Sequence, residues 1–298
     1  MKEKYTLYIL LLVIVTIAGC GTARHVATLQ EEAELEYTTG NYIDALDLYE
    51  QIIELKKDRN LEVSGETWYR AGIAAWENEL LNKAIGYLVN AGRKDYYSEE
   101  GYYILATAYR EIDNLSLEIT NLENYIEKYP DGSKADEMRI RLFDAYLESN
   151  NHEGALELWK YLENMAPGNP DILENWFILN SRLGREDKLK DIALKLYNAD
   201  NKNVTAIEYL GDHYFWIAEN RYQKEMKAYE ENHTRRQYRQ LLSALDTINE
   251  QFRLSRDYFE KLMDIDPQPV YAEYLRNIYK RFGNEEKADY YHRRSLEL

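Results

Sequence analysis

The sequence predicts an all-α fold: a solenoid of stacked helical hairpins with one extended, coiled-coil-like hairpin near its C-terminal end. A pattern of large and small residues occurs twice at a distance of 34 residues, first as Trp68, Gly72 and Leu88 and then as Tyr102, Ala106 and Leu122. A period of this length is typical of an array of helix pairs, in which each unit is buried by its neighbours. The polar and apolar alternation that is typical of strands does not occur in the sequence.

Small residues indicate how the two helices of a pair meet. Ala33 and Ala45 are 12 residues apart, and so are Gly72 and Ala84. This spacing fits two antiparallel helices of about three to four turns whose backbones come close at the small side chains. The equivalent first-helix position recurs after Ala106 in steps of 37, 34 and 34 residues, at Phe143, Phe177 and Gly211.

These units resemble the tetratricopeptide repeat (TPR) family. The best copies are Trp68-Tyr69-Arg70-Ala71-Gly72 with Ala84, Leu88 and Ala91, and Tyr102, Leu105, Ala106, Tyr109 and Pro130, with Glu118 where the family usually has a small residue. Partial copies contain Gly40-Asn41-Tyr42 with Ala45 and Tyr49, Leu142 with Tyr146, Ala155, Trp159 and Pro167, Trp176 with Gly184 and Leu196, and Leu275 with Tyr279, Gly283 and Ala288. The resemblance covers nearly all of the chain after residue 26. It implies a fold, but a fold alone does not define a function.

Periodicity and capping signals place the helices up to residue 200. They are expected at 27–39, 42–57, 64–79, 81–92, 98–113, 115–129, 134–149, 152–165, 170–183 and 186–199. The organisation that follows is a signal peptide (1–19), a lipidated tether (20–28), TPR-like repeats (29–203), a repeat with a long hairpin insertion at about 218–250 (204–267) and a capping repeat (268–298).

The N-terminus has the features of an export signal. Three charged residues precede an apolar run from Tyr5 to Ala18, which is short for a membrane-spanning helix. The run ends in Ile17-Ala18-Gly19-Cys20, which resembles the lipobox of bacterial lipoproteins at every position. The resemblance implies cleavage before Cys20, the single cysteine of the chain, and its modification with acyl chains such as palmitate. Because Gly21 follows and no aspartate is present there, it also implies the periplasmic face of the outer membrane.

The repeat spacing changes once. After Gly211 the expected small residue 12 positions later is missing, and the pattern resumes at Ser255, 44 residues on. With a turn at Glu231-Asn232-His233, this excess predicts that both helices of the unit are about 16 residues, or roughly 24 Å, longer than usual. Apolar residues at spacings of three and four provide a contact surface between the two arms: Tyr222, Met226, Tyr229, Leu241, Leu245, Ile248 and Phe252.

The tip of this hairpin is basic. Its cationic residues are Arg221, Lys224, Lys227, Arg235, Arg236 and Arg239, against Glu225, Glu230 and Glu231. Two interpretations are open. The tip docks on an acidic partner or on lipid headgroups, or its charges only solvate a projecting hairpin through pairs such as Glu231 with Arg235.

The charge of the chain is strongly negative and uneven. A net charge of -16 argues against binding to nucleic acid or to an anionic lipid surface. From Cys20 to Asn220 the sequence has 38 acidic and 20 basic residues, whereas Arg221 to Leu298 has 14 and 15. This distribution fits a cationic protein partner, and it fits equally well a solvated surface that keeps the protein soluble.

In TPR proteins the first helix of each pair lines the concave face, so the resemblance implies a partner-binding groove. Its main residues are Tyr37, Tyr69, Trp76, Glu77, Tyr103, Arg110, Glu111, Asp144 and Glu148, and further positions are Glu34, Ile73, Thr107, Ile140, Glu174, Ile178, Glu208 and Asp212. Carboxylates beside Tyr and Trp rings suit an extended peptide or helix that bears Lys or Arg. For each of these residues a packing role is the alternative.

Signals of catalysis are weak. The five histidines are scattered, and no metal-ligand spacing, phosphate-binding glycine loop or Gly-x-Ser-x-Gly turn occurs. We therefore expect a non-catalytic periplasmic lipoprotein scaffold of an envelope assembly or secretion complex, with no metal, cofactor or small-molecule substrate. A glycan-binding or peptidoglycan-associated activator is the alternative, since exposed Tyr and Trp rings can stack on sugars.

Overall fold

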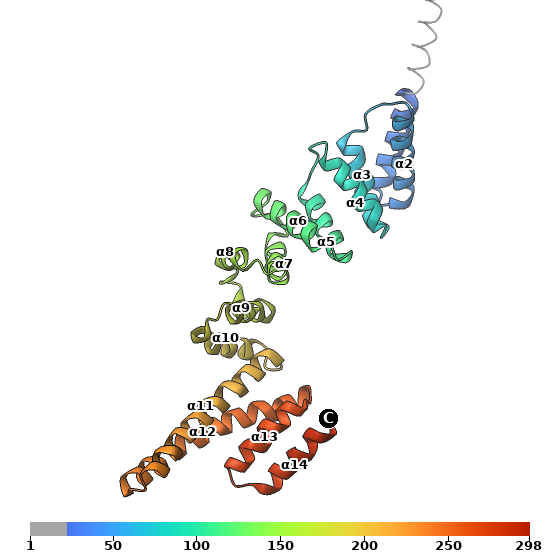
Figure 1. The fold of residues 1–298 in the computed structure, drawn as a ribbon. Coiled ribbons are helices and arrows are strands. Elements are labelled where there is room, and N and C mark those ends of the chain that lie inside the picture. The colour runs from blue at the N-terminus through green and yellow to red at the C-terminus, as the bar shows by residue number, and fades with distance from the viewer. Residues whose placement is uncertain (1–22) are drawn as a thin grey trace, which may run out of the picture. The chain divides into compact units, whose positions relative to one another are not determined.

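The computed structural model describes residues 23–298, which are helical with no strand among them (Figure 1). This confirms the all-α, helical-hairpin solenoid. The chain forms two compact units, unit 1 ending at Ser149 and unit 2 spanning Asn150–Leu298. The predicted signal peptide and Cys20 lie outside the described residues and stay predictions.

Unit 1 is a run of antiparallel helices. A helix over residues 23–38 is followed by α2 (Tyr42–Asp58), α3 (Gly65–Glu77), α4 (Leu81–Gly92), α5 (Glu99–Glu111), α6 (Leu115–Lys128) and α7 (Ala135–Glu148). Helix α3 packs against α2 and α4, and α6 packs against α5 and α7. The bounds of α2 to α7 agree with the sequence-based ranges to within two residues.

The first helix begins earlier than expected. Residues 23–28, assigned from the sequence mostly to a tether, are helical. The physical reason is burial, since Val26 and Leu29 each retain only 8% exposure and join the core of unit 1. The helical segment therefore starts within a few residues of Cys20.

Unit 2 contains the long hairpin. Its helices are α8 (His152–Leu162), the 3-10 turn η1 (Ala166–Gly168), α9 (Pro170–Arg182), α10 (Glu186–Ala199), α11 (Val204–Glu231), α12 (Arg235–Ile265), α13 (Pro269–Arg281) and α14 (Glu285–Glu297). Helices α11 and α12 have 28 and 31 residues, and α13 packs beside α12 (Figure 1). The prolonged helix pair and its turn next to Glu231 are confirmed.

Local signals explain where the helices begin. Side chains accept a hydrogen bond from the first turn at Ser64, Ser98, Asn114, Asn151, Asn169, Asn203, Thr234 and Asn284. Each satisfies a backbone N–H that the helix leaves unpaired. The turn after a first helix also repeats, with a left-handed residue at Gly40, Glu79, Asp113, Asn150, Gly184 and Gly283. The same short turn therefore closes successive hairpins despite different residue types.

Small residues lie where the helices approach most closely. A Cβ at Gly72 would lie 2.7 Å from Leu88 Cγ on the neighbouring helix, and one at Gly211 would lie 3.1 Å from the Phe259 ring. At the latter contact Ser255 Oγ donates a hydrogen bond of 2.7 Å to the Gly211 carbonyl, and Ser255 is fully buried. Gly211 and Ser255, between which the repeat pattern is interrupted for 44 residues in the sequence, are thus in direct contact.

Candidate functional site

Contacts between successive first helices build one continuous surface in unit 1. Arg70 on α3 forms an ion pair of 3.1 Å with Glu34 on the helix before α2, and Tyr69 donates a hydrogen bond of 2.8 Å to Glu100 on α5. Further along, the Tyr103 hydroxyl on α5 lies 3.4 Å from Glu137 on α7. We call this surface, formed by the helix over residues 23–38 with α3, α5 and α7, the first-helix surface.

At the N-terminal end of this surface, charge and aromatic rings are combined. The Arg70 guanidinium lies 4.5 Å from the centre of the Tyr37 ring, and Tyr49 donates a hydrogen bond of 3.1 Å to Glu34. Burial raises the pKa of Tyr37, and the Glu100 carboxylate adds to this rise. Both ends of the Arg70–Glu34 pair are thus committed to neighbours within unit 1.

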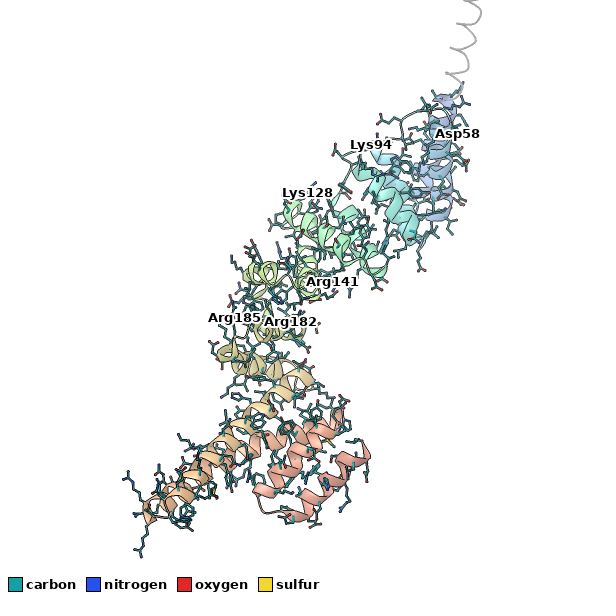
Figure 2. The ribbon with its side chains drawn as sticks, in the orientation of Figure 1. Asp58, Lys94, Lys128, Arg141, Arg182 and Arg185 are labelled. Atoms are coloured by element: carbon teal, nitrogen blue, oxygen red, sulfur yellow. The ribbon has the colours of Figure 1, made fainter. Side chains whose placement is uncertain are left out.

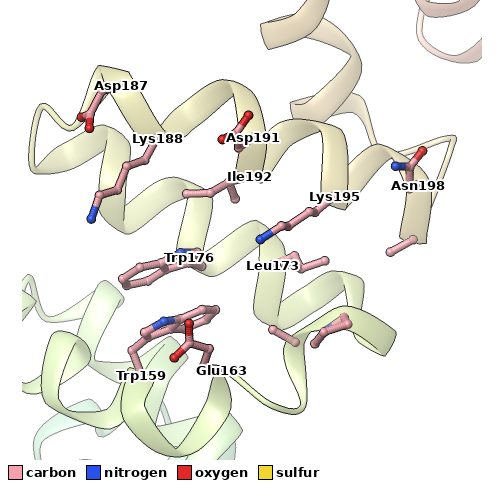
Figure 3. Close-up of a pocket in the computed structure, with 13 residues that line it drawn as sticks. Trp159, Glu163, Leu173, Trp176, Asp187, Lys188, Asp191, Ile192, Lys195 and Asn198 are labelled. Atoms are coloured by element: carbon pink, nitrogen blue, oxygen red, sulfur yellow. The ribbon is translucent and has the colours of Figure 1, made fainter.

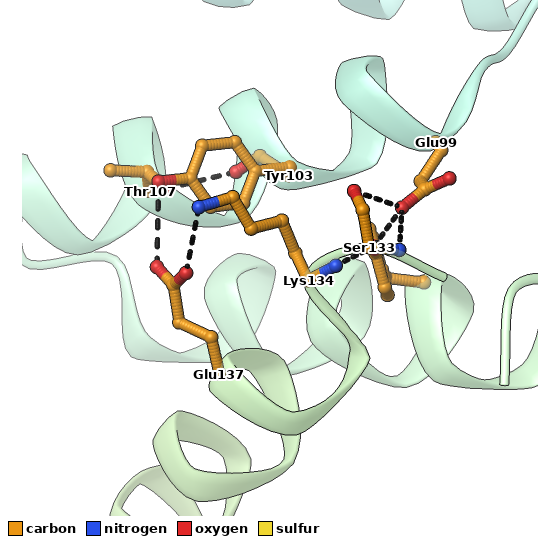
Figure 4. Close-up of polar contacts among 7 residues, drawn as sticks. Glu99, Tyr103, Thr107, Ser133, Lys134 and Glu137 are labelled. Atoms are coloured by element: carbon orange, nitrogen blue, oxygen red, sulfur yellow. Dashed lines mark hydrogen bonds and ion pairs between the residues drawn. The ribbon is translucent and has the colours of Figure 1, made fainter. Parts of the chain in front are cut away.

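A second cluster surrounds Tyr103 (Figure 4). Lys134 Nζ lies 5.4 Å from the centre of the Tyr103 ring and 3.1 Å from Glu137, while Thr107 Oγ1 donates to the Tyr103 carbonyl at 2.9 Å. Tyr103 is half-buried, and Glu137 is exposed. The cluster shows that an aromatic face of this surface already accepts a lysine, here the residue directly before α7.

In unit 1, three first helices end in glutamate. Glu77, Glu111 and Glu148 are the last residues of α3, α5 and α7, and all three are exposed. The C-terminus of a helix carries a partial negative charge, so a carboxylate there is locally unfavourable. Among the described residues Glu77 and Glu111 have no ion-pair partner, whereas Glu148 lies 2.7 Å from Arg141. The ends of these helices therefore form a negatively charged edge beside the half-buried Trp76.

A polar pocket of about 450 Å³ lies at this edge and brings together three predicted residues, Arg110, Glu111 and Glu148. It is completed by Asp113, Leu115, Glu118 and Arg141. Glu118 is 2% exposed and receives two hydrogen bonds from the Arg141 guanidinium, at 2.5 and 2.9 Å. This explains the glutamate at a position where TPR proteins usually have a small residue, because its charge is neutralised by Arg141 on α7, the next first helix. Figure 2 labels Arg141 on the ribbon of the whole chain.

Two predicted positions need correction. Tyr69 is 8% exposed and Ile73 is 2% exposed, so both pack in the core of unit 1 and offer a partner almost no surface. The Tyr69 hydroxyl is also engaged by Ser98 at 2.6 Å and by Glu100. Sequence reasoning missed Arg70, Glu137 and Arg141. The four-residue spacing between Glu66 and Arg70 was the available signal for the first of these.

In unit 2, two of the carboxylates predicted to bind a partner already accept hydrogen bonds from neighbouring residues. The Glu174 carboxylate accepts hydrogen bonds from Thr205 and Asn203, and Asp212 accepts from Trp216 at 3.0 Å and from Tyr274 at 2.5 Å. These carboxylates hold neighbouring helices together. The exposed Trp216, 48% accessible, was not predicted.

The basic residues of the hairpin tip are all exposed: Lys224, Lys227, Arg235, Arg236 and Arg239. Lys227 lies 3.9 Å from Glu231, and within residues 23–298 the other four have no ion-pair partner. The expected pair between Glu231 and Arg235 does not form, because the helix ends at Glu231 and the two residues lie on different arms.

Two further features, a membrane-spanning helix and a metal site, are absent from residues 23–298. No helix there combines the length and apolar character that a membrane span requires. No group of three or more His, Cys, Asp or Glu side chains in this part of the chain could hold a metal ion.

Comparison with solved structures identifies the architecture. The C-terminal part of a TPR repeat-containing protein from Cytophaga hutchinsonii is 14% identical, with a TM-score of 0.51 over 90% of this chain and 94% of that chain. YrrB, a TPR protein with an unusual peptide-binding site, is 18% identical, with a TM-score of 0.47 over 59% of this chain and 87% of its own. A tetratricopeptide repeat protein from Parabacteroides merdae is 12% identical, with a TM-score of 0.44 over 92% and 93%.

No protein-family model and no curated protein matches the sequence. The likeness to the Cytophaga structure extends over both units and concerns the fold alone. Together with the repeated helix pairs, it shows that this chain has a TPR-like fold.

Proposed function

We propose that this protein is a non-catalytic scaffold whose first-helix surface in unit 1 binds a basic segment of a protein partner. One observation carries the proposal: Glu77 and Glu111, which end α3 and α5, are exposed and have no ion-pair partner among residues 23–298, and the half-buried Trp76 adjoins Glu77. Carboxylates next to aromatic faces attract Lys and Arg side chains through both charge and cation–π contact. Unit 1 also has 26 acidic and 13 basic residues between positions 23 and 149, which favours association with a cationic partner.

The double variant Trp76→Ala with Glu77→Lys tests this proposal. It removes one ring and reverses one unpaired charge at the same edge, so partner capture from cell extracts is expected to be lost while the melting temperature changes little. Glu54→Lys, an equal charge change at an exposed position within α2, is the matched control. Retained capture by the double variant would count against this surface. Crosslinking in cells from position 111 would identify the partner.

The proposed setting is the bacterial envelope. The sequence from Ile17 to Cys20 supports lipid attachment, and the helix that begins near residue 23 would then hold unit 1 close to the periplasmic face of the outer membrane. Metabolic labelling with palmitate tests it directly, since wild-type protein should take up label and Cys20→Ala should not. Wild-type protein that takes up no label, or equal labelling of the Cys20→Ala variant, would contradict anchoring through this residue.

The hairpin tip is proposed as a separate docking element for an acidic partner. Its cationic side chains are exposed and mostly without ion-pair partners in the described part of the chain, whereas the arms below them pack through Leu241, Ala244 and Ile248. Deletion of Tyr222 to Gln251 should remove one co-purifying protein while unit 1 remains folded. Sedimentation of the chain with purified peptidoglycan would instead favour the cell-wall alternative.

A further inference from the structure

We propose that unit 2 contains a second peptide-binding site, a pocket between α8, α9 and α10 that takes an aromatic side chain flanked by charged residues of both signs. The pocket lies in unit 2, is lined mainly by α10, the second helix of its pair, and shares no residue with the first-helix surface of unit 1. It is thus independent of the function proposed above.

The pocket has a volume of about 710 Å³. Pockets that bind small ligands or side chains span about 300–1,000 Å³. Figure 3 shows α10 on one side, Trp159 of α8 and Glu163 just after α8 on the other, and Leu173 and Trp176 of α9 between them. Its size admits an aromatic ring with part of the adjoining backbone.

One wall of the pocket is a pair of indoles. Trp159 and Trp176 stack with their ring centres 3.9 Å apart and their planes at 4°, and both are half-buried. Ile192 and Leu173 extend the apolar wall, and Ala166, Pro167 and Ala199 complete it. Leu173, Ile192 and Ala166 are buried, so the aromatic surface that the pocket offers is that of the two half-buried indoles, on which an aromatic side chain can pack.

The rim of the pocket is charged with both signs. On α10, Asp187, Asp191 and Lys195 follow one another at four-residue steps with Lys188 beside them, and Glu163 faces them from just after α8. Asp191 and Lys195 have the spacing of a helical ion pair. Within residues 23–298, however, neither they nor Lys188, Asp187 or Glu163 take part in any ion pair. These five charges are free to meet charges on a ligand.

The chemistry of the rim selects the ligand class. A peptide that carries an acidic and a basic residue beside an aromatic one can pair with Lys195 or Lys188 at one end and with Asp191 or Glu163 at the other. A neutral sugar could stack on an indole, but it carries no charge to pair with these exposed side chains, whereas a peptide with both signs of charge gains from pairing with them. The geometry therefore points to a peptide.

Ligand-observed NMR titration of the full chain with acetyl-Lys-Phe-Glu-amide and acetyl-Lys-Ala-Glu-amide tests the proposal. The Phe peptide is expected to bind about tenfold or more tightly than the Ala peptide, the difference that burial of one aromatic ring provides. Trp176→Ala should abolish this preference. Because that variant also removes a packing residue, Asn198→Trp, which fills the pocket from its exposed rim, is the second variant and should have the same effect.

Two controls make the outcome specific. Trp216→Ala removes an exposed indole of unit 2 outside the pocket, and Lys202→Trp adds one at an exposed position outside it, so both should keep the Phe preference. Glu77→Lys in unit 1 should also leave it unchanged, which separates this site from the first-helix surface. Equal binding of the two peptides, unaltered preference in folded Asn198→Trp, or pocket-dependent binding of a peptidoglycan disaccharide in place of the peptides would overturn the assignment.

Discussion

Hydrogen bonds from tyrosine to carboxylate recur between helices throughout the described chain. Tyr125 donates to Glu99 at 2.5 Å, Tyr146 to Glu123 at 2.7 Å, and Tyr279 to Glu260 at 2.6 Å. In each pair the ring packs like a phenylalanine while the hydroxyl reaches a carboxylate on another helix. This gives a physical reason for 28 tyrosines and only six phenylalanines in so acidic a chain.

The Tyr125 hydroxyl should make stability depend on pH at both extremes. Burial, reinforced by Glu99, raises the pKa of Tyr125 to about 12, so its contribution is present below the ordinary pKa and lost as pH rises toward 12. The bonds from Tyr125 and Ser133 lower the pKa of Glu99, so that contribution is present above about pH 4.3 and lost as pH falls below it.

Tyr125→Phe is therefore expected to lower the free energy of unfolding by about 1–2 kcal/mol near neutral pH, and by less at both extremes. Denaturant unfolding of wild type and variant across the pH range measures the difference. A destabilisation that does not change with pH would show that packing, and not the hydrogen bond to Glu99, determines the loss.

Glycine at position 72 is required by contact with the neighbouring helix. A Cβ there would lie 2.7 Å from Leu88 Cγ and 3.2 Å from the Leu88 backbone nitrogen, and Leu88 is fully buried. Overpacking costs about 1–3 kcal/mol, which exceeds the gain of about 1 kcal/mol in helix propensity.

Gly72→Ala should accordingly lower stability by up to about 2 kcal/mol, which is the cost of overpacking less the gain in helix propensity. Gly86→Ala is the matched control, because a Cβ at this position in α4 meets nothing within 4 Å. The control should be stabilised by about 0.5–1 kcal/mol through helix propensity alone. Thermal unfolding of both variants decides the point, and a shift of the same sign in both would refute the close-contact argument.

At the scale of the helices, substitution of the glutamates that end α3 and α5 should change stability and partner binding in opposite directions. Glu77 and Glu111 stand at the negative ends of α3 and α5, so replacement by lysine should improve the interaction with the helix dipole. The double variant Glu77→Lys with Glu111→Lys is expected to gain about 0.5–2 kcal/mol in stability while losing the partner. The control is the double variant Glu54→Lys with Glu157→Lys, which makes the same change in net charge at exposed positions within helices. If the double variant lost stability, these glutamates would have an unrecognised structural role.

Helix lengths were predictable because they depend on local spacing. The distance of 44 residues from Gly211 to Ser255 predicted the long hairpin, and both residues meet in the structure. Which side chains stay exposed to a partner was less predictable, because their exposure depends on contacts between repeats. Tyr69 occupies a first-helix position like Tyr103, yet only Tyr69 is drawn into the core. The pocket beside Trp159 likewise depends on how closely three helices pack, which no repeat period encodes.

Across the whole molecule, charge is distributed unequally between the two units. Residues 23–149 have 26 acidic and 13 basic side chains, while residues 150–298 have 26 and 22. Like charges within a compact unit repel one another, and this repulsion lowers the stability of unit 1 more than that of unit 2. The excess of acid is thus a cost in stability that binding of a cationic partner would offset.

Salt should therefore protect unit 1 selectively. Raising ionic strength from about 0.01 M to about 0.15 M shortens the Debye length from about 30 to about 8 Å, which screens the repulsion among separated carboxylates more than it weakens close pairs such as Arg141 with buried Glu118. Hydrogen exchange read by mass spectrometry resolves the two units within the intact chain. Amides of α3 to α6 are expected to gain more protection with salt than those of α9, α10 and α13. Equal gains in both units, or slower exchange at low salt in unit 1, would mean that local ion pairs outweigh the net charge.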